Sequence, residues 1–483
     1  MKKLLFLIGI LSSGLYGASI DHIQTYSPDY LSNQAQTGMI DEVSPYYNPA
    51  GLSRLDKGKY VHLGLQLANG HEKMSYKGKE HKAILNQLIP NVSLTSVDDN
   101  GAYFFTFGGL AGGGKLEYDG VSGIDVLSDL DQFKPLGVYD KGSTLTGKNL
   151  YEQATLGRAF TINDQLSVSV AGRIVHGSRN LSGTLNIGTN PSTAYKQAKV
   201  QQITQEVSKA VDAATQGSGL SAAQIAAIKQ QKTTQALTLL QTKMNALQQN
   251  GLSGDLDSKR EAWGYGFQIG VNYKVNDKLN LAARYDSRIK MNFKAKGSEN
   301  QLQTADIIGS NIGLSTFYPQ YAINSKIRRD LPAILSVGAS YKVTDNYLVS
   351  TSANYYFNRH AKMDRVTTFG GHEHGRDYKN GWEIALGNEY KLNDKFTLIG
   401  SVNYARTGAK NSSFNDTEYA LNSVTLGAGL RYKYDETLSI TGSVAHFIYD
   451  KEDGNFKEKY KVNDNQKYHK EITAFGLSVT KKF

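Results

Sequence analysis

The sequence predicts an all-β fold, a transmembrane antiparallel β-barrel of 14 strands, and three observations support this prediction. Long segments alternate apolar and polar residues with the period of two that a half-buried strand requires. Short turns rich in Asn and Asp connect these segments in pairs, whereas the opposite connections are long. The chain also begins with the layout of an export signal.

The clearest alternation is WGYGFQIGVNYKV at 263–275, where aromatic and aliphatic residues form one face and Gly, Gln, Asn and Lys the other. The segment 279–293 continues this pattern, with Ile289, Met291 and Phe293 on the same apolar face as Leu281 and Tyr285. Both segments exceed the ~5–6 residues of typical soluble strands and suit the ~9–11 residues of a membrane strand. A soluble sandwich or barrel would show the same alternation of apolar and polar residues, so it is the length of the segments that favours a membrane barrel.

Six short turns mark the strand boundaries: VDDNGA from residue 97, INDQ from 162, VNDK from 275, VTDN from 343, LNDK from 392 and YDET from 434. They delimit strands at about 59–74, 87–97, 102–118, 147–161, 165–186, 262–274, 278–296, 332–343, 346–358, 381–392, 395–408, 421–434, 436–450 and 472–483. The other connections are longer, including 75–86, 187–261 and 297–331. This asymmetry and an even strand number are typical of outer-membrane barrels, whose short turns face the periplasm.

The composition is consistent with this class. The 483 residues include no Cys, 30 Tyr, 48 Gly and 8 Pro, which suits many strands with aromatic girdles and no disulfides. A mean hydropathy of -0.43 is compatible with a barrel, because only alternate residues of each strand need be apolar. The net charge of +10 is spread along the chain. It is weak evidence for anionic partners such as lipid head groups and does not indicate nucleic-acid binding.

The chain divides into three parts. Residues 1–18 form the predicted signal peptide, with Lys2 and Lys3 before an apolar run at 4–11 that is too short to span a bilayer as a helix. Residues 19–57 precede the first strand, and Pro45 and Pro49 in SPYYNPAGLSRL (44–55) oppose strand pairing there. Residues 58–483 form the predicted barrel.

The connection 187–261 is predicted to be a helical extracellular loop. Ser221 and Gln224 have the spacing of a capping box, and GSG at 217–219 separates two helices with apolar stripes. The stripes either pack on each other or line a groove that captures hydrophobic molecules.

The segment before the first strand resembles that of the FadL/TodX (OmpP1) family of outer-membrane transporters of hydrophobic compounds. The matching motif is Asn48, Pro49, Ala50 and Gly51, placed shortly after a signal and directly before a 14-strand pattern. The resemblance implies that residues 19–57 form a hatch inside the barrel lumen, and the alternative is a flexible periplasmic leader. The terminal alternation of Phe475, Leu477, Val479 and Phe483 also resembles the signal read by the barrel assembly machinery.

The resemblance implies a sideways exit for substrate at a kink in the third strand. That strand, AYFFTFGGLAGGGKLEY at 102–118, is interrupted by Gly108, Gly109, Gly112, Gly113 and Gly114. Glycines in a strand mark bulges, kinks or close approaches. The alternative is a bend in the barrel without an opening.

The resemblance also implies substrate capture at the outer loops. Apolar residues occur there in segments that should otherwise be hydrated, which is typical of binding sites. Mutual packing of the two loops is the alternative. The candidates are Leu237, Leu240 and Met244 in the helical loop and Ile307, Ile308, Ile312, Leu314 and Phe317 in the next loop.

A fatty-acid carboxylate would need a cation in a mostly apolar pocket. Arg284, Arg288 and Lys290 are predicted to point inward, and Asp286 among them could neutralise one of them. Arg173 and Arg431 are weaker candidates. For a neutral aromatic or alkane these charges would only make the lumen polar.

Other chemistry finds little support. His372, Glu373 and His374 could share a metal only if they lay on a strand, and they are predicted to lie in a hydrated loop. The sequence contains no cofactor or nucleotide motif. We therefore expect neither a metal, a cofactor nor an enzymatic activity. The expectation is a monomeric outer-membrane barrel of a Gram-negative-type bacterium, in contact with membrane lipid, for passive uptake of long-chain fatty acids or other hydrophobic compounds. The alternatives are a porin for polar solutes and a surface adhesin or structural barrel.

Overall fold

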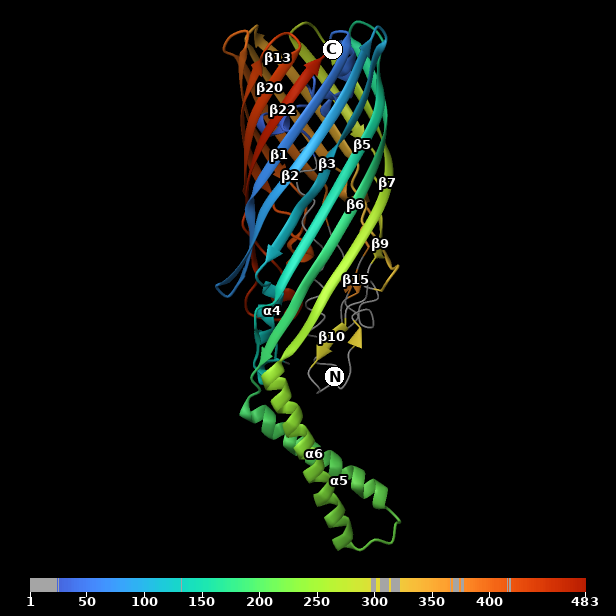
Figure 1. Cartoon of the computed structure of the whole chain (residues 1–483), viewed down its shortest axis with the longest axis vertical. Coiled ribbons are helices and arrows are strands. Elements are labelled where there is room, and N and C mark those ends of the chain that lie inside the picture. The colour runs from blue at the N-terminus through green and yellow to red at the C-terminus, as the bar shows by residue number, and fades with distance from the viewer. Residues whose placement is uncertain are drawn as a thin grey trace.

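The computed structural model describes residues 24, 26–131, 133–296, 301–304, 312–313, 322–364, 366–367, 373–374, 378–414, 416 and 418–483. They form a closed antiparallel barrel, and the predicted fold class with 14 spanning strands is confirmed (Figure 1). The spanning strands are β1 (Gly58–Tyr76), β2 (Lys79–Asp98), β3 (Gly101–Tyr118), β5 (Thr144–Thr161), β6 (Leu166–Thr189), β7 (Leu252–Lys274), β8 (Leu279–Asp286), β13 (Ile334–Thr344), β14 (Tyr347–Tyr356), β17 (Gly381–Lys391), β18 (Phe396–Arg406), β19 (Ser423–Lys433), β20 (Leu438–Tyr449) and β22 (Lys467–Lys482).

The barrel closes between its first and last strands. β1 pairs with β22 from Tyr60 opposite Lys482 to Ser75 opposite Lys467, so this seam leaves no free sheet edge. The C-terminus lies at the upper end in Figure 1, and the helices α5 and α6 lie at the other. We call these the short-turn end and the long-loop end.

The expectation of an outer loop over 75–86 is wrong. β1 and β2 continue into a tight hairpin at Lys77 and Gly78, which have φ angles of 49° and 83°. Two central residues with positive φ are the signature of a two-residue hairpin turn whose twist matches that of the strands. The alternating pattern stops at the charged residues 79–82, so the sequence did not predict that the strands continue there. A strand that rises beyond the lipid no longer needs an apolar outer face.

The outer face of β7 shows the height of the apolar band. Trp263, Phe267 and Tyr273 are all exposed, whereas Gln268 and Asn272 on the other face are buried. The eleven residues from Trp263 to Tyr273 agree with the ~9–11 residues that cross a bilayer. β7 itself begins at Leu252, so it rises well beyond this band at the long-loop end.

The long-loop end carries most of the remaining elements. Two helices, α5 (Thr193–Thr215) and α6 (Ala222–Asn250), project beyond the barrel (Figure 1). The predicted capping box of Ser221 and Gln224 is present at the start of α6. No helix among the described residues is long and apolar enough to cross a membrane. The shorter elements are α4 (Ser122–Asp125), η2 (Val126–Asp129), η3 (Lys134–Leu136), β4 (Val138–Asp140), β9 (Asn292–Lys296), β10 (Gln301–Thr304), β11 (Ile312–Gly313), β12 (Lys326–Arg328), η6 (Asn358–His360), β15 (Val366–Thr367), β16 (Glu373–His374), η7 (Asn411–Ser413), β21 (Glu452–Asp453) and α7 (Phe456–Tyr460).

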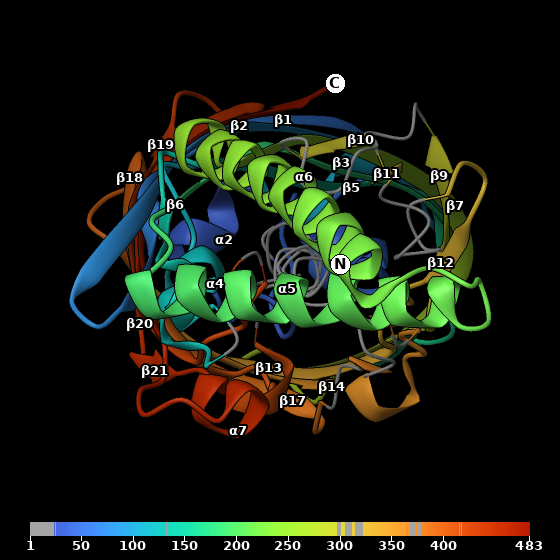
Figure 2. The same ribbon diagram turned by 90° about the horizontal axis from the view of Figure 1, so that it is seen from below.

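The N-terminal segment lies within the ring of strands (Figure 2). We call its described residues between 24 and 57 the plug. It consists of α2 (Asp29–Ser32), α3 (Ser44–Tyr47) and η1 (Pro49–Arg54), joined by irregular chain. Most of its side chains are buried, although the segment is rich in polar residues.

Candidate functional site

The plug is held by small hydroxyl groups on the inner face of the barrel. Serine side chains from four strands donate hydrogen bonds to plug carbonyl groups, which lack partners in a regular helix or sheet. The wall therefore accepts a segment that its prolines keep out of the strand ladder. The bonds run from Ser443 Oγ to Pro28 O at 2.7 Å, Ser401 to Ser32 at 2.8 Å, Ser340 to Gly38 at 2.8 Å and Ser167 to Ala50 at 2.7 Å.

The Asn-Pro-Ala-Gly motif lies where the plug meets β7. Asn48 Oδ1 accepts a hydrogen bond from the Gly51 backbone N–H at 3.2 Å and so caps η1, in which Pro49 is the first residue. Asn48 Nδ2 donates to Met39 O at 2.9 Å and to Asn272 Oδ1 at 2.8 Å. Asn48 therefore joins two parts of the plug to the wall.

We predict that Asn48→Ala loosens the plug without unfolding the barrel. The variant loses the cap and the bond to Asn272, at a cost of about 1–2 kcal/mol. Amide hydrogen exchange over residues 44–55 should accelerate by about 5–30-fold, the factor that corresponds to this free energy. Ser53→Ala is the control, because Ser53 Oγ donates only to the nearby Ala50 O. Equal exchange in both variants would contradict the assigned role of Asn48.

Four plug tyrosines form an aromatic group next to this motif: Tyr26, Tyr30, Tyr46 and Tyr47. The ring centroids of Tyr26 and Tyr47 are 5.8 Å apart and those of Tyr30 and Tyr47 are 5.6 Å apart. Burial raises the pKa of Tyr26 to about 12, so its hydroxyl stays neutral. Tyr46 Oη accepts a hydrogen bond from Asn91 Nδ2 of β2 at 2.9 Å. The aromatic group is thereby tied to the wall.

The ladder between β2 and β3 is interrupted beside this group. β3 pairs with β2 up to Gly108 opposite Asn91, and the next pair is Tyr118 opposite Ala83. On its other side β3 shows irregular register against β5 on both sides of Ala111. Gly112 and Gly114 have φ angles of 114° and 68°, which side chains rarely adopt. We call the interval between residues 84–90 and 109–117 the β2–β3 seam. Of the predicted kink glycines, Gly108 borders it, and Gly109, Gly112, Gly113 and Gly114 lie within it.

An apolar cluster inside the barrel connects the seam to the plug. It receives residues from the plug, from β3, β5, β6 and β7, and from the chain around 289–334. Such a buried, largely apolar cluster inside a barrel offers hydrophobic surface that suits a hydrophobic ligand. We call it the luminal cluster: Tyr26, Tyr30, Val43, Tyr46, Tyr47, Leu110, Tyr151, Val175, Ala262, Ile289, Met291, Phe293, Leu331 and Ile334.

A buried charge group lies against the plug. Arg284 and Asp286 of β8 form an ion pair with Arg284 Nε 3.1 Å from Asp286 Oδ2, and Arg173 Nη1 is 3.5 Å from Asp286 Oδ1. The Arg284 guanidinium also donates to the Tyr46 carbonyl oxygen and, at 2.7 Å, to Gln24 Oε1. Arg284 therefore holds the plug. A substrate carboxylate could reach it only by displacing these partners.

The structure corrects two expectations for residues 287–293. Ile289, Met291 and Phe293 are not on the lipid face but buried in the luminal cluster. Arg288 and Lys290 do not join Arg284: both are exposed, and Arg288 Nη1 donates to His360 O at 2.8 Å. The weaker candidate Arg431 pairs with Glu389 at 3.0 Å.

The reason is a break in the β7 ladder. β7 pairs with β8 at 268–274 and with β9 at 259–261, so 262–267 have no ladder partner on that side. The chain crosses over the inner face of β7, where a Cβ on Gly264 would lie 2.4 Å from Ile289 Cγ2. Alternation continues in the sequence through this crossing, and only the pair of glycines at Gly264 and Gly266 marks it.

Asp41 is a carboxyl group of the plug with one buried oxygen atom. Its Oδ1 accepts from the Val43 N–H at 3.1 Å, whereas its Oδ2 is buried without a hydrogen-bond partner among the described residues. Burial raises the pKa of Asp41 to about 7, with Arg431 opposing the shift and Glu42, Glu389 and Asp29 adding to it.

We predict that the plug is held less tightly as the pH rises from about 4 to about 7. In this range the carboxyl of a released plug is ionised, whereas that of the seated plug is still protonated. Hydrogen exchange over residues 38–48, corrected for its intrinsic pH dependence, should be about tenfold less protected at pH 8 than at pH 5. Asp41→Asn should abolish the difference, and Asp394→Asn, at an exposed turn carboxylate, should retain it. An unchanged pH dependence in Asp41→Asn would refute the prediction.

The predicted capture residues are described only in part. Met244 is buried at the base of α6, and Leu237 and Leu240 are half-buried. The side chains of Ile307, Ile308, Ile312, Leu314 and Phe317 lie outside the described residues, as do those of His372, Glu373 and His374. Whether the two loops form one groove stays a prediction. Among the described residues, no group of three or more His, Asp or Glu side chains could hold a metal.

Sequence reasoning missed the aromatic part of the site. Tyr26, Tyr30, Tyr46 and Tyr47 were available as a signal, since four tyrosines are unusual for a periplasmic leader. Tyr151 and Leu110 lie within β5 and β3 and carry no local signal in the sequence. Only the fold brings them together.

Comparison with known proteins identifies relatives. A family model described as "Outer membrane protein transport protein (OMPP1/FadL/TodX)" matches residues 141–483. Outer membrane protein P1 of Haemophilus influenzae is 24% identical over 257 residues, which are 51% of this chain and 52% of that protein. The long-chain fatty acid transport protein of Escherichia coli O157:H7 is 21% identical over 275 residues, 56% of this chain and 58% of that protein. The match thus spans about half the length of these relatives.

Solved structures show the same fold over nearly the whole chain. The toluene transporter TodX of P. putida has a TM-score of 0.63 at 16% identity, covering 96% of this chain and 99% of its own. A FadL homologue of Pseudomonas aeruginosa has a TM-score of 0.62 at 15% identity, covering 95% and 98%.

Proposed function

Because the chain belongs to the OMPP1/FadL/TodX family of outer-membrane transport proteins, we propose that it takes up long-chain fatty acids or other hydrophobic compounds by passive diffusion. The protein is located in the outer membrane. Members of the family are transporters or channels of hydrophobic compounds rather than enzymes. The short-turn end then faces the periplasm, as in other bacterial outer-membrane barrels.

The observation that carries the proposal is the β2–β3 seam next to the luminal cluster. In the seam, neighbouring strands lie close, yet their ladder is absent over 84–90 and 109–117. Leu110 and Ala111 of this interval pack into the luminal cluster. A hydrophobic molecule in the cluster is thus one strand away from the lipid, and sideways exit spares it from crossing water.

The plug is the element that would control this exit. Tyr46 of α3 contacts Asn91, which borders the seam, through its hydroxyl, and Arg284 through its backbone carbonyl. A movement of α3 would therefore disturb the seam and the charge group together. We assign the plug the role of a hatch, and Asn48, Pro49, Ala50 and Gly51 its attachment to the wall.

Tyr151 is a polar feature of the cluster that points to a ligand. Its side chain is fully buried, and its hydroxyl has no hydrogen-bond partner among the described residues. A buried unpaired hydroxyl is costly, and a ligand with a polar head group would relieve that cost. This favours amphiphiles such as fatty acids over plain hydrocarbons.

The test is direct binding of a radiolabelled long-chain fatty acid and of labelled toluene to the protein in nanodiscs. Leu110→Ala removes apolar contact in the cluster and should weaken binding about tenfold. Leu63→Ala is the matched control, because Leu63 is 54% exposed on the outer face of β1. Saturable binding lowered only by Leu110→Ala supports the proposal. Absence of saturable binding of both ligands would refute it.

A surface adhesin is the second candidate, and the projecting helices α5 and α6 favour it. Val200 and Leu239 are 40% and 55% exposed on them. Deletion of residues 193–250 should leave binding in the luminal cluster intact. If the deletion abolishes attachment of cells to surfaces instead, the helices have an adhesive function.

A further inference from the structure

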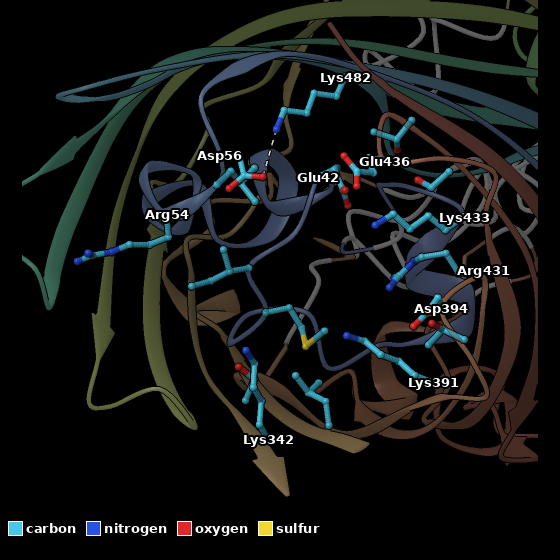
Figure 3. Close-up of a pocket in the computed structure, with 18 of the residues that line it drawn as sticks. Glu42, Arg54, Asp56, Lys342, Lys391, Asp394, Arg431, Lys433, Glu436 and Lys482 are labelled. Carbon is cyan, nitrogen blue, oxygen red and sulfur yellow. Dashed lines mark hydrogen bonds and ion pairs between the residues drawn. The ribbon is translucent and has the colours of Figure 1, made fainter. Parts of the chain in front are cut away.

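A large cavity opens at the short-turn end, on the side of the plug away from the luminal cluster. Its volume is about 1100 Å³, slightly above the ~300–1,000 Å³ typical of ligand sites. Its walls are the ends of strands and the short turns, and the plug forms its inner boundary (Figure 3). We call it the vestibule.

The vestibule has an excess of positive charge. Nine lysine and arginine side chains line it, against six carboxylates. Some of these are paired: Lys482 with Asp56 at 3.1 Å, and Arg431 with Glu389 at 3.0 Å. Three others, Lys342, Lys391 and Lys433, have no carboxylate within ion-pair distance among the described residues.

These three lysines line the vestibule from three different strands. They lie near the ends of β13, β17 and β19, and their side chains point into the vestibule (Figure 3). Each lies two residues beyond an inward-facing position, as Lys433 does beyond Arg431, so the strand period directs it inward. Uncompensated cations on the walls of a concave site focus their field there and attract anions.

Part of the vestibule lining is apolar, beside the charged plug residues Glu42, Arg54 and Asp56. Met39, Ile40 and Leu55 of the plug form this apolar part, together with Leu279 and Leu348 of the wall. The site therefore combines some hydrocarbon surface with an excess of cations. This is the arrangement that binds a molecule with a hydrocarbon chain and one anionic head group.

We propose that the vestibule binds an anionic amphiphile, with the head group at Lys342, Lys391 and Lys433 and the chain against Met39, Ile40 and Leu55. Glu42 of the plug lines the same vestibule. The head group is a carboxylate or a phosphate, from a free fatty acid or from an anionic phospholipid. This site lies outside the path of the proposed function and does not depend on it.

The experiment uses a fluorescent reporter on Thr397→Cys, which lines the vestibule in a chain with no other cysteine. Oleate, oleyl alcohol and acetate are titrated in nanodiscs of neutral phosphatidylcholine. Oleate should bind at least tenfold more tightly than oleyl alcohol or acetate, and raising the salt concentration should weaken only oleate. Equal affinity for oleate and oleyl alcohol would overturn the proposal.

A charge-matched pair of variants completes the test. Lys342→Gln/Lys391→Gln/Lys433→Gln should weaken oleate binding at least tenfold. Lys451→Gln/Lys457→Gln/Lys467→Gln removes the same charge at exposed positions of the long-loop end and should leave it unchanged. Equal affinities in the two variants would also overturn the proposal.

The lipid composition of the nanodisc shows whether the bound head group comes from a phospholipid or from a fatty acid. If phosphatidylglycerol in the nanodisc shifts the reporter before oleate is added, and the shift is lost in the vestibule variant, the occupant is an anionic phospholipid. If the reporter responds only to oleate, the occupant is a fatty acid. Leu110→Ala should alter neither result, which separates this site from the luminal cluster.

Discussion

A disulfide across the β2–β3 seam should reduce uptake of hydrophobic substrate by at least tenfold. A Cβ at position 109 would lie 2.9 Å from Ile89 Cγ2, so Ile89→Cys and Gly109→Cys are within reach of each other. The chain has no native cysteine, so the designed bond is the only one that can form. If substrate leaves sideways through the seam, joining its two sides blocks the exit, and reduction restores it. The measurement is uptake of labelled fatty acid by cells, with and without reductant.

The control disulfide joins the same two strands where their ladder is intact. Leu94→Cys and Phe105→Cys are opposite each other in the pairing of β2 with β3. This bond should leave uptake unchanged, because no opening exists there. Full uptake through the oxidised seam variant would exclude sideways exit and favour passage through the plug.

Arg284→Ala should release the plug and open the barrel to small polar solutes. The substitution removes the bonds to the Tyr46 carbonyl and Gln24. Among the described residues, it leaves Arg173 as the remaining ionic partner of the buried Asp286. Breaking a buried ion pair costs about 3–5 kcal/mol. Liposomes containing the variant should swell several-fold faster in sugar solutions than those containing the wild type, and residues 24–57 should become accessible to protease.

The double variant Arg284→Ala/Asp286→Ala distinguishes the effect of an unpaired Asp286 carboxylate from the loss of the hydrogen bonds between Arg284 and the plug. It removes the uncompensated carboxylate, so the plug should regain part of its protection. A swelling rate equal to that of the wild type in Arg284→Ala would contradict the role of Arg284 in holding the plug. Fast swelling of the wild type would instead support the porin alternative.

Local patterns were sufficient for the barrel and for the helical loop. Alternation and the Asn/Asp turns are properties of neighbouring residues, because a strand in a membrane must present every second side chain to lipid. Ser221 and Gln224 specify the start of α6 through contacts three residues apart. The pattern failed at the first hairpin, where β1 and β2 rise beyond the lipid and need no apolar face.

The site was predictable only at positions where the backbone itself is unusual. The glycines of β3 predicted an irregular strand, and Gly112 and Gly114 do have positive φ angles. The side chains of the luminal cluster come from positions as distant as Tyr26 and Leu331, and no periodicity links them. Their assembly requires the closed barrel.

Residue order alone was enough to assign the class of the protein, which is an alternating 14-strand chain preceded by a proline-marked segment that cannot join the ladder. The roles of the inward-facing groups became evident only from contacts within the closed barrel. In the structure Arg284 binds the plug rather than a substrate head group, and Ile289 lies in the luminal cluster. Lys391 has no ionic partner among the described residues. The physical reason is that strand period fixes the direction of a side chain, whereas its partner depends on segments brought together by barrel closure.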